Sequence, residues 1–213
     1  MAFRNRQEAG AALASLLATW TDHADAVVLG LVRGGVPVAF EVAARLRLPL
    51  DVLVIRKLGV PWAPEVAFGA VGPGGVQVLN REIAMRLDED EMAEVIRYES
   101  AELHRRERLF RQGRPALDLT GRPALLIDDG LATGATAGAA VAVARKLAAA
   151  HVVLAAPVGA TAAVARLQRR ADQVVCPLAE SDFGAVSRFY DDFHQLTDTD
   201  VTDLLARRLP PAA

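Results

Sequence analysis

Residues 124–136 read Ala-Leu-Leu-Ile-Asp-Asp-Gly-Leu-Ala-Thr-Gly-Ala-Thr, and this stretch decides the fold. The apolar run at 124–127 is typical of a buried strand, and it ends in the adjacent carboxylates of Asp128 and Asp129. A loop of small residues follows, and an alanine-rich run then predicts a helix over 135–150. A buried strand, a loop and a helix in this order form the repeating unit of an α/β protein with a parallel sheet.

The same unit recurs on both sides of this stretch. Short apolar runs bounded by turn residues predict further strands at 26–31, 50–55, 152–157 and 173–176. Helical patterns follow at 36–46 and 161–170. We therefore expect an α/β fold: a doubly wound, mainly parallel five-stranded sheet flanked by helices. In such sheets ligands bind at the carboxyl ends of the strands.

The remaining segments predict additions to one domain spanning residues 1–213, with a core at about 24–176. An amphipathic pattern at 5–20 indicates a helix that packs on the body. Residues 76–79 read as an edge strand, and the densely charged segment 81–113 reads as a helical insertion. The tail at 177–209 is aromatic and acidic, with a helix near 200–208.

Composition narrows the class of protein. Of the residues, 52% are hydrophobic and 5% aromatic, which suits buried parallel strands. The formal charge of −2 gives no global field for nucleic acid or a membrane surface. The single cysteine, Cys176, excludes an internal disulfide and reads as a buried apolar thiol. The apolar stretch at 130–144 is shorter than the ~18 residues of a membrane span, and without a signal peptide pattern we expect a cytoplasmic protein.

The loop after Asp129 has the chemistry of a phosphate site. Glycine and alanine let backbone N–H groups approach a phosphate, the hydroxyls of Thr133 and Thr136 add donors, and the start of a helix favours an anion. The acids cannot face that phosphate, but they can accept hydrogen bonds from sugar hydroxyls. The stretch therefore predicts a ribose 5-phosphate site, whose phosphate is held by Gly130, Leu131, Ala132, Thr133, Gly134, Ala135 and Thr136.

Other sites with similar parts fit less well. No lysine follows Gly134, as a P-loop requires, and the Gly-x-Gly-x-x-Gly dinucleotide pattern is absent. A response-regulator receiver needs a phosphoacceptor aspartate at the end of a later strand, whereas Asp172 precedes one. A purely structural turn, in which the two acids cap a helix, stays open.

Residues 127–136 resemble the phosphoribosyl pyrophosphate (PRPP) signature of type I phosphoribosyltransferases. Nearly the whole chain is similar to a bacterial group of predicted phosphoribosyltransferases. The resemblance implies that Asp128 and Asp129 are catalytic in transferring the 5-phosphoribosyl group of PRPP to a nitrogenous base or similar acceptor. The resemblance also implies that pyrophosphate is released. Mg²⁺ would bridge the diphosphate oxygens and the ribose hydroxyls of PRPP, with the two acids nearby.

Two further segments match the family's diphosphate site. Residues 30–37 resemble its pyrophosphate loop, with Arg33, Gly34 and Gly35 at the turn, and arginine suits phosphate while glycine permits close backbone approach. Arg56 and Lys57 follow the second expected strand, where two cations would meet the same diphosphate. An ordinary turn and a pair of solvated charges are the plainer alternatives.

The resemblance also implies a lid and a hood. The insertion at 81–113 would be the lid, with Arg105 and Arg106 as contributors, unless they are only solvated. The C-terminal segment would be a small hood that stacks the acceptor base on Phe189 or Tyr190, although core packing explains these aromatics equally well. Ser187 stands where the group pattern has glycine.

A second class of function stays open. Some relatives of this fold keep the PRPP site but act as non-catalytic regulators, and a third reading is a phosphorylase or hydrolase. A sensor of nucleic acid needs a basic face, but acids interrupt the basic residues between 97 and 114. We therefore expect an enzyme of nucleotide and nucleoside metabolism that binds PRPP and a small-molecule acceptor rather than nucleic acid. Relatives often form homodimers.

Overall fold

The computed structural model describes residues 3–207, and its centre is a five-stranded parallel sheet. The strand order β2-β1-β6-β7-β9 is the doubly wound arrangement that the sequence predicted. Parallel strands covered on both faces need continuous apolar runs, and every residue of β1 is buried. The bounds are β1 Val27–Leu31, β2 Leu50–Leu53, β6 Pro123–Ile127, β7 His151–Ala155 and β9 Gln173–Val175.

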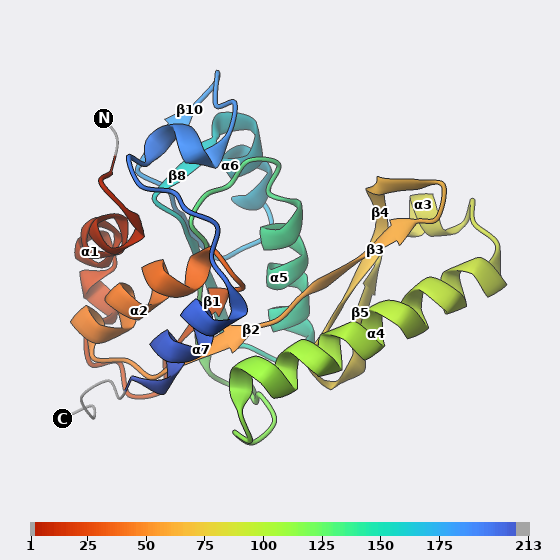
Figure 1. Cartoon of the computed structure of the whole chain (residues 1–213), viewed down its shortest axis with the longest axis horizontal. Helices are drawn as coiled ribbons and strands as arrows, with labels where there is room; N and C mark the ends of the chain where they lie inside the picture. Colours follow the sequence, from red (N-terminus) through yellow and green to blue (C-terminus); the bar gives the residue numbers. More distant parts are fainter. Residues whose placement is uncertain (1–2, 208–213) are drawn as a thin grey trace.

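Helices cover both faces of this sheet (Figure 1). Side chains alternate along a strand, so Leu125 packs with Leu13 on one face while Leu126 packs with Val141 on the other. The first face carries α1 and α2, and the second carries α5 and α6. The bounds are α1 Arg6–Leu16, α2 Gly35–Leu46, α5 Ala135–Lys146 and α6 Thr161–Leu167.

Three of these helices are shorter than the sequence predicted. The helix expected over 135–150 ends at Lys146, because Ala148 has a φ of 59° and turns the chain towards β7. The helix expected over 161–170 ends at Leu167. The helix expected over 5–20 divides into α1 and a 3-10 turn at Ala18–Trp20.

An arm projects from the body after β2, and the sequence predicted only part of it. Figure 1 shows its three antiparallel strands, ordered β3-β4-β5, with bounds β3 Arg56–Val60, β4 Ala63–Gly72 and β5 Val76–Leu79. Only β5 was expected. The strand expected over 50–55 stops at Leu53, so Arg56 and Lys57 begin β3 instead of ending β2.

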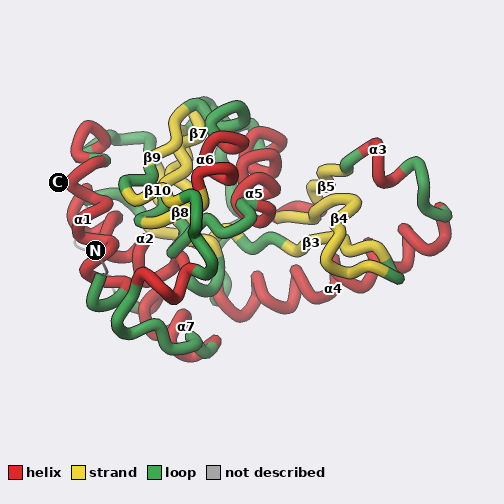
Figure 2. Tube along the Cα trace, turned by 90° about the horizontal axis from the view of Figure 1, so that it is seen from above, coloured by secondary structure: helices red, strands yellow, loops and turns green. Residues whose placement is uncertain are grey.

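Two helices complete the arm, α3 (Arg81–Ala84) and α4 (Glu89–Arg111). Viewed from above, α4 runs from the tip of the arm back to the body (Figure 2). Its apolar side packs Leu103 and Phe110 with Phe68 of β4. Helices were predicted here, but the arm spans residues 56–111 instead of 81–113 alone. No helix of the described chain is both long and apolar enough to cross a membrane.

The C-terminal segment folds over the edge of the sheet next to α1. β10 (Leu178–Glu180) pairs with β8 (Val158–Ala160), and a 3-10 turn follows at Val186–Phe189. The last helix, α7, spans Asp198–Ala206 and packs on α2 and α4. A capping box between Thr197 and Asp200 starts it two residues before the expected position. Residues 208 and 209, expected in this region, lie outside the described residues.

Replacing glycine by alanine should have opposite effects on stability at two helical positions. A Cβ at Gly10 of α1 would lie 2.8 Å from the Val38 carbonyl oxygen of α2, so Gly10→Ala must push these helices apart. We expect a loss of about 1–3 kcal/mol in the free energy of unfolding, measured by chemical denaturation. A Cβ at Gly138 of α5 would meet the flexible end of the Arg170 side chain at 3.2 Å and make an ordinary contact with Leu167 at 3.6 Å. Gly138→Ala should therefore gain up to about 1 kcal/mol from helix propensity. Equal stability of the two variants would contradict this packing.

Candidate functional site

The site forms where the doubly wound sheet reverses its strand order, between β1 and β6. These strands are parallel neighbours, and Gly30 pairs with Ile127 at their carboxyl ends. The loops that leave them therefore emerge side by side, at the position where such sheets bind ligands. A Cβ at Gly34 would overlap the carboxylate of Asp129, and one at Gly35 would overlap the Ile127 carbonyl oxygen. Only glycine allows the two loops to approach this closely.

Asp128 and Asp129 occupy unlike environments. Asp129 is buried, whereas Asp128 is partly open to solvent and its Oδ1 accepts a hydrogen bond from the Asp129 N–H, at 2.9 Å. Burial raises the pKa of Asp128 well above its ordinary value, and the neighbouring charge of Asp129 raises it further. Burial also raises the pKa of Asp129, but the Arg6 guanidinium opposes that rise. Asp128 is thus the acid whose charge is less compensated.

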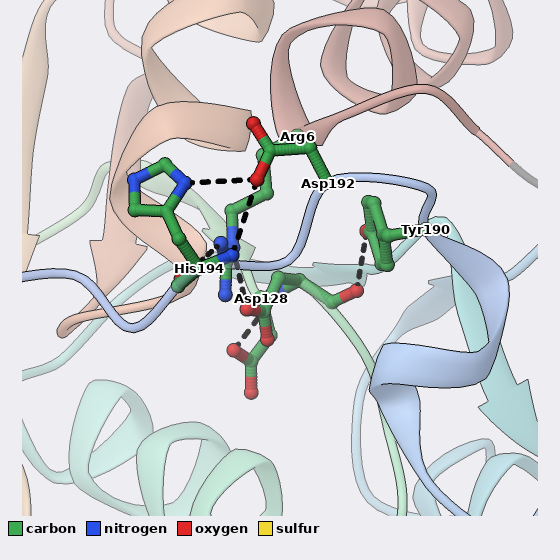
Figure 3. A network of polar contacts seen from close by, with 6 residues as sticks. Arg6, Asp128, Tyr190, Asp192 and His194 are labelled. Atoms are coloured by element: carbon green, nitrogen blue, oxygen red, sulfur yellow. Dashed lines mark hydrogen bonds and ion pairs between the residues drawn. The ribbon is translucent and has the colours of Figure 1, made fainter.

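Arg6 is the site residue that sequence reasoning missed (Figure 3). Its Nε donates to Oδ2 of Asp129 at 2.9 Å, and its Nη1 donates to the His194 carbonyl at 3.1 Å. Its guanidinium lies 3.8 Å above the centre of the Phe193 ring. Exposed fractions of 7% for the Arg6 side chain and 13% for that of Asp129 make this a buried ion pair. No local pattern marks residue 6, because its partners lie far away in the sequence.

Tyr190 supports the same acid from the other side. Its hydroxyl donates to the Asp129 backbone carbonyl at 2.7 Å, and burial raises the pKa of that hydroxyl, so it remains a donor. Tyr190 itself is buried among aromatic neighbours that include Phe3 and Phe193. Phe189 stacks on Phe183 with 4.9 Å between ring centres. Of the two rings predicted to stack a base, Phe189 is therefore the more open.

The loop after the acids has the form that a phosphate cradle requires, except that the N–H groups of Leu131 and Ala135 already have acceptors, that of Ala135 being Oγ1 of Thr133 at 3.3 Å. Gly134 has a φ of 66°, and α5 begins at the next residue, so the N–H groups of its first turn have no partner within the helix. Ala132 and Thr133 are exposed, and Gly130, Ala135 and Thr136 flank them. Leu131 differs, because it is buried and its N–H donates to the Val158 carbonyl. That N–H is not available to a phosphate.

Most of the predicted cations are already paired with carboxylates. Arg33 lies 3.6 Å from Asp198 of α7, and Arg56 lies 2.6 Å from Glu99 of α4. Arg105 and Arg106 both bond Glu102 on their own helix, and these hydrogen bonds lower the pKa of Glu102 to about 2. The two arginines predicted for a lid thus form a local network on α4.

Lys57 is exposed and faces a cavity between the arm and α5. This cavity has a volume of about 880 Å³ and also borders Ala135 and Gly138, at the start of α5. The predicted cation and the predicted phosphate loop therefore share one opening. A smaller cavity of about 350 Å³ adjoins Arg6 and His194.

Cys176 takes no part in this site. It is half-buried, and burial raises the pKa of its thiol to about 11, so it stays protonated at neutral pH.

Comparison with known proteins gives matches of three kinds. The model of the phosphoribosyl transferase domain matches residues 4–194. Two proteins of Mycobacterium tuberculosis, from strains CDC 1551 and H37Rv, carry provisional names as phosphoribosyl transferases. Each is 52% identical to this chain over 207 residues, which are 96% of this chain and 46% of the relative. The chain thus spans about half the length of these curated relatives. A crystal structure of a protein from Thermus thermophilus has a TM-score of 0.86 and 43% identity, covering 96% of this chain and 98% of that one.

The unlike environments of the two acids predict opposite effects on stability. Burial raises the pKa of both acids, but Asp129→Asn also removes the charge that compensates buried Arg6, and the unpaired guanidinium should outweigh the relief, for a loss of about 3 kcal/mol in the free energy of unfolding. A carboxyl whose pKa is raised by folding costs stability once the pH exceeds its unfolded value, so Asp128→Asn should raise the melting temperature at pH 7. Thermal unfolding monitored by circular dichroism measures both changes. If both variants melted below the wild type by similar amounts, the charge distribution described here would be wrong.

Proposed function

Since the chain belongs to the phosphoribosyl transferase family, we propose that it transfers the 5-phosphoribosyl group of PRPP to a nitrogenous base or similar acceptor, releasing pyrophosphate. This reaction would place it in nucleotide metabolism. The relatives from Mycobacterium tuberculosis are about twice as long as this chain. The proposal therefore concerns the half of such a protein that the chain matches.

One observation carries the proposal: the turn at Gly34 lies directly against the carboxylate of Asp129. Sequence reasoning assigned the second loop to the sugar and its phosphate from its residues, and the first loop to diphosphate through the resemblance to the family. In PRPP the diphosphate is attached to C1 of the sugar and the nearest hydroxyl to the neighbouring C2, so their two sites must be adjacent. The contact between the loops satisfies that requirement.

The two acids would accept unequal numbers of hydrogen bonds from the sugar hydroxyls. Arg6 already donates to Oδ2 of Asp129, which reduces the capacity of that carboxylate to accept from a ligand. Asp128 is partly open and lacks such a partner, so we assign it the larger share of the hydrogen bonds to ribose hydroxyls. Its negative charge would also stabilise the positive charge that develops on the sugar ring as pyrophosphate departs.

The two phosphate groups would be held at opposite ends of this arrangement. Backbone N–H groups from Ala132 to Thr136 suit the 5-phosphate, because they surround the start of α5. Arg33 suits the diphosphate, since its pairing with Asp198 is long, at 3.6 Å, and both side chains are more than one-third exposed. Lys57 would add a second positive charge, because it is exposed and faces the cavity between the arm and α5.

The residues present fit a Mg²⁺ ion that arrives with its ligand. Magnesium is usually held by one or two carboxylates together with substrate phosphates, and Asp128, a partly exposed residue, offers a carboxylate. Over residues 3–207, no three His, Cys, Asp or Glu side chains gather into a metal site made by the protein alone. When bound, Mg²⁺ would neutralise the charge of the diphosphate.

The acceptor would lie between the sheet edge and the C-terminal segment. Tyr190 is engaged in holding Asp129, so Phe189 is the better candidate to stack on a base. Its ring is half-buried and stacked on Phe183, and a base would extend that stack.

Calorimetric titration with PRPP, with and without Mg²⁺, tests the ligand. We expect binding that requires Mg²⁺, and a loss of affinity of about a hundredfold or more in Asp128→Asn, because its carboxylate can no longer accept as an anion. Asp25→Asn is the matched control, since Asp25 is exposed at the opposite end of β1. It should bind PRPP like the wild type.

Turnover is tested with a panel of bases by following pyrophosphate release. The double variant Asp128→Asn/Asp129→Asn should lose activity by orders of magnitude, provided that circular dichroism shows it folded. Near-normal turnover in that variant would refute the assigned roles. PRPP binding without turnover on any base would instead support the non-catalytic sensor, and no binding by the wild type would refute the ligand.

A further inference from the structure

The outer face of α4 carries an ordered stripe of exposed residues that the proposed function does not use. Its members recur at alternating spacings of three and four, so they lie along one face of the helix. All are exposed, and Tyr98 is 69% exposed. The opposite side of the helix holds Leu103 and Phe110 in the core of the arm. In chain order the stripe is Glu91, Glu94, Tyr98, Ala101, Arg105 and Arg108.

The stripe is complementary to itself when reversed. Spacings of 3, 4, 3, 4 and 3 read the same in both directions. A two-fold axis between Glu99 and Ser100 would set Glu94 opposite Arg105 of a second copy. The same axis sets Glu91 opposite Arg108 and Tyr98 opposite Ala101. Each acid meets a base and each large residue meets a small one, as an isologous interface requires.

We propose that two copies of this chain associate through α4, with these helices antiparallel and the stripe as their seam. A parallel arrangement would set acids against acids and bases against bases, so charge selects the antiparallel one. Antiparallel helices also place opposite ends of their dipoles together. The proposal concerns assembly and is independent of the reaction proposed above.

Helix dipoles alone do not explain the stripe. Acids in the first turn and bases in the last turn stabilise any helix, and that effect fades beyond one turn. It accounts for Glu91 and Arg108, but Glu94 and Arg105 lie further in. It gives no reason for an exposed tyrosine midway between them. Association explains the order of the charges and the exposure of Tyr98 together.

The neighbouring contacts leave the seam free to form. Arg105 bonds Glu102 through Nε and Nη2, and neither bond uses Nη1, which can meet Glu94 of the second copy. Glu91, Glu94 and Tyr98 border a groove of about 490 Å³ beside the loop between β3 and β4. Trp62 in that loop is 74% exposed and would extend the contact. Figure 1 shows α4 along the outer edge of the arm, with no other helix of the described chain over that side.

The expected interface is small and electrostatic. The stripe extends about 26 Å along the helix, at 1.5 Å per residue. The surface area that such a seam buries on each partner is smaller than the roughly 800 Å² found in stable complexes. The dimer should therefore be reversible and concentration-dependent. Exposed charge pairs are screened by salt, and about 1 M salt should shift the equilibrium towards monomer.

Sedimentation velocity over a concentration series tests the seam. The double reversals Glu91→Arg/Glu94→Arg and Arg105→Glu/Arg108→Glu should each weaken dimerisation about tenfold or more, because each creates four like-charge contacts. An equimolar mixture of the two variants should restore dimers, since one seam is then all basic and the other all acidic. Lys146→Glu/Arg169→Glu, which reverses two exposed cations on the body, is the matched control and should dimerise like the wild type.

Three results would overturn the proposal. The first is a wild-type chain that remains monomeric at its highest soluble concentration. The second is a dimer that neither double reversal weakens. The third is a mixture that stays monomeric although circular dichroism shows both variants folded. Dimers in the wild type and in the mixture, but not in either variant alone, would establish the antiparallel seam.

Discussion

The buried ion pair between Arg6 and Asp129 joins the parts of the molecule that make the site. Arg6 belongs to the first helix and Asp129 follows the central strand, while His194 and Phe193 of the C-terminal segment surround the same guanidinium. Burying two charges is costly unless each finds a partner and its remaining polar atoms are bonded. The arrangement is therefore intolerant of partial assembly: if one segment moved away, a charged group would remain buried without compensation. The position of the acid is fixed by three segments instead of by its own loop.

The sequence alone predicted the features that depend on local residue patterns. It missed the contacts between residues that are far apart in the chain. The five strands and their parallel, doubly wound arrangement were predictable because parallel strands need continuous apolar runs and right-handed connections. The acidic pair and the small-residue loop were predictable because the residues that define their chemistry are adjacent in the sequence. Arg6 gave no such signal, since its partners stand 123 and 188 residues away in the sequence. Tyr190 was predicted to stack a base, but its hydroxyl bonds Asp129 and its ring is buried.

The arm shows a second limit of prediction from local sequence patterns. Arg56 and Lys57 interrupt an apolar run, so the pattern predicted the end of a strand where β3 in fact begins. Pro64, Gly69 and Gly72 punctuate β4 in a way that usually indicates loops. These residues are tolerated because the arm buries its own apolar cluster around Phe68 and Phe110. The charges of α4 were visible in the sequence, but which of them remain exposed depended on that packing.

The long-range contacts of Arg6 also set an order of events during synthesis. The chain leaves the ribosome from its N-terminus, and domains form as their segments become available. Arg6 emerges early, but Asp129 comes much later and the His194 carbonyl later still. Until residue 194 has emerged, the strands can pair while the guanidinium still lacks its second acceptor, the His194 carbonyl. The last strand of the sheet ends at Val175, so the sheet can form before the contacts of Arg6 are complete.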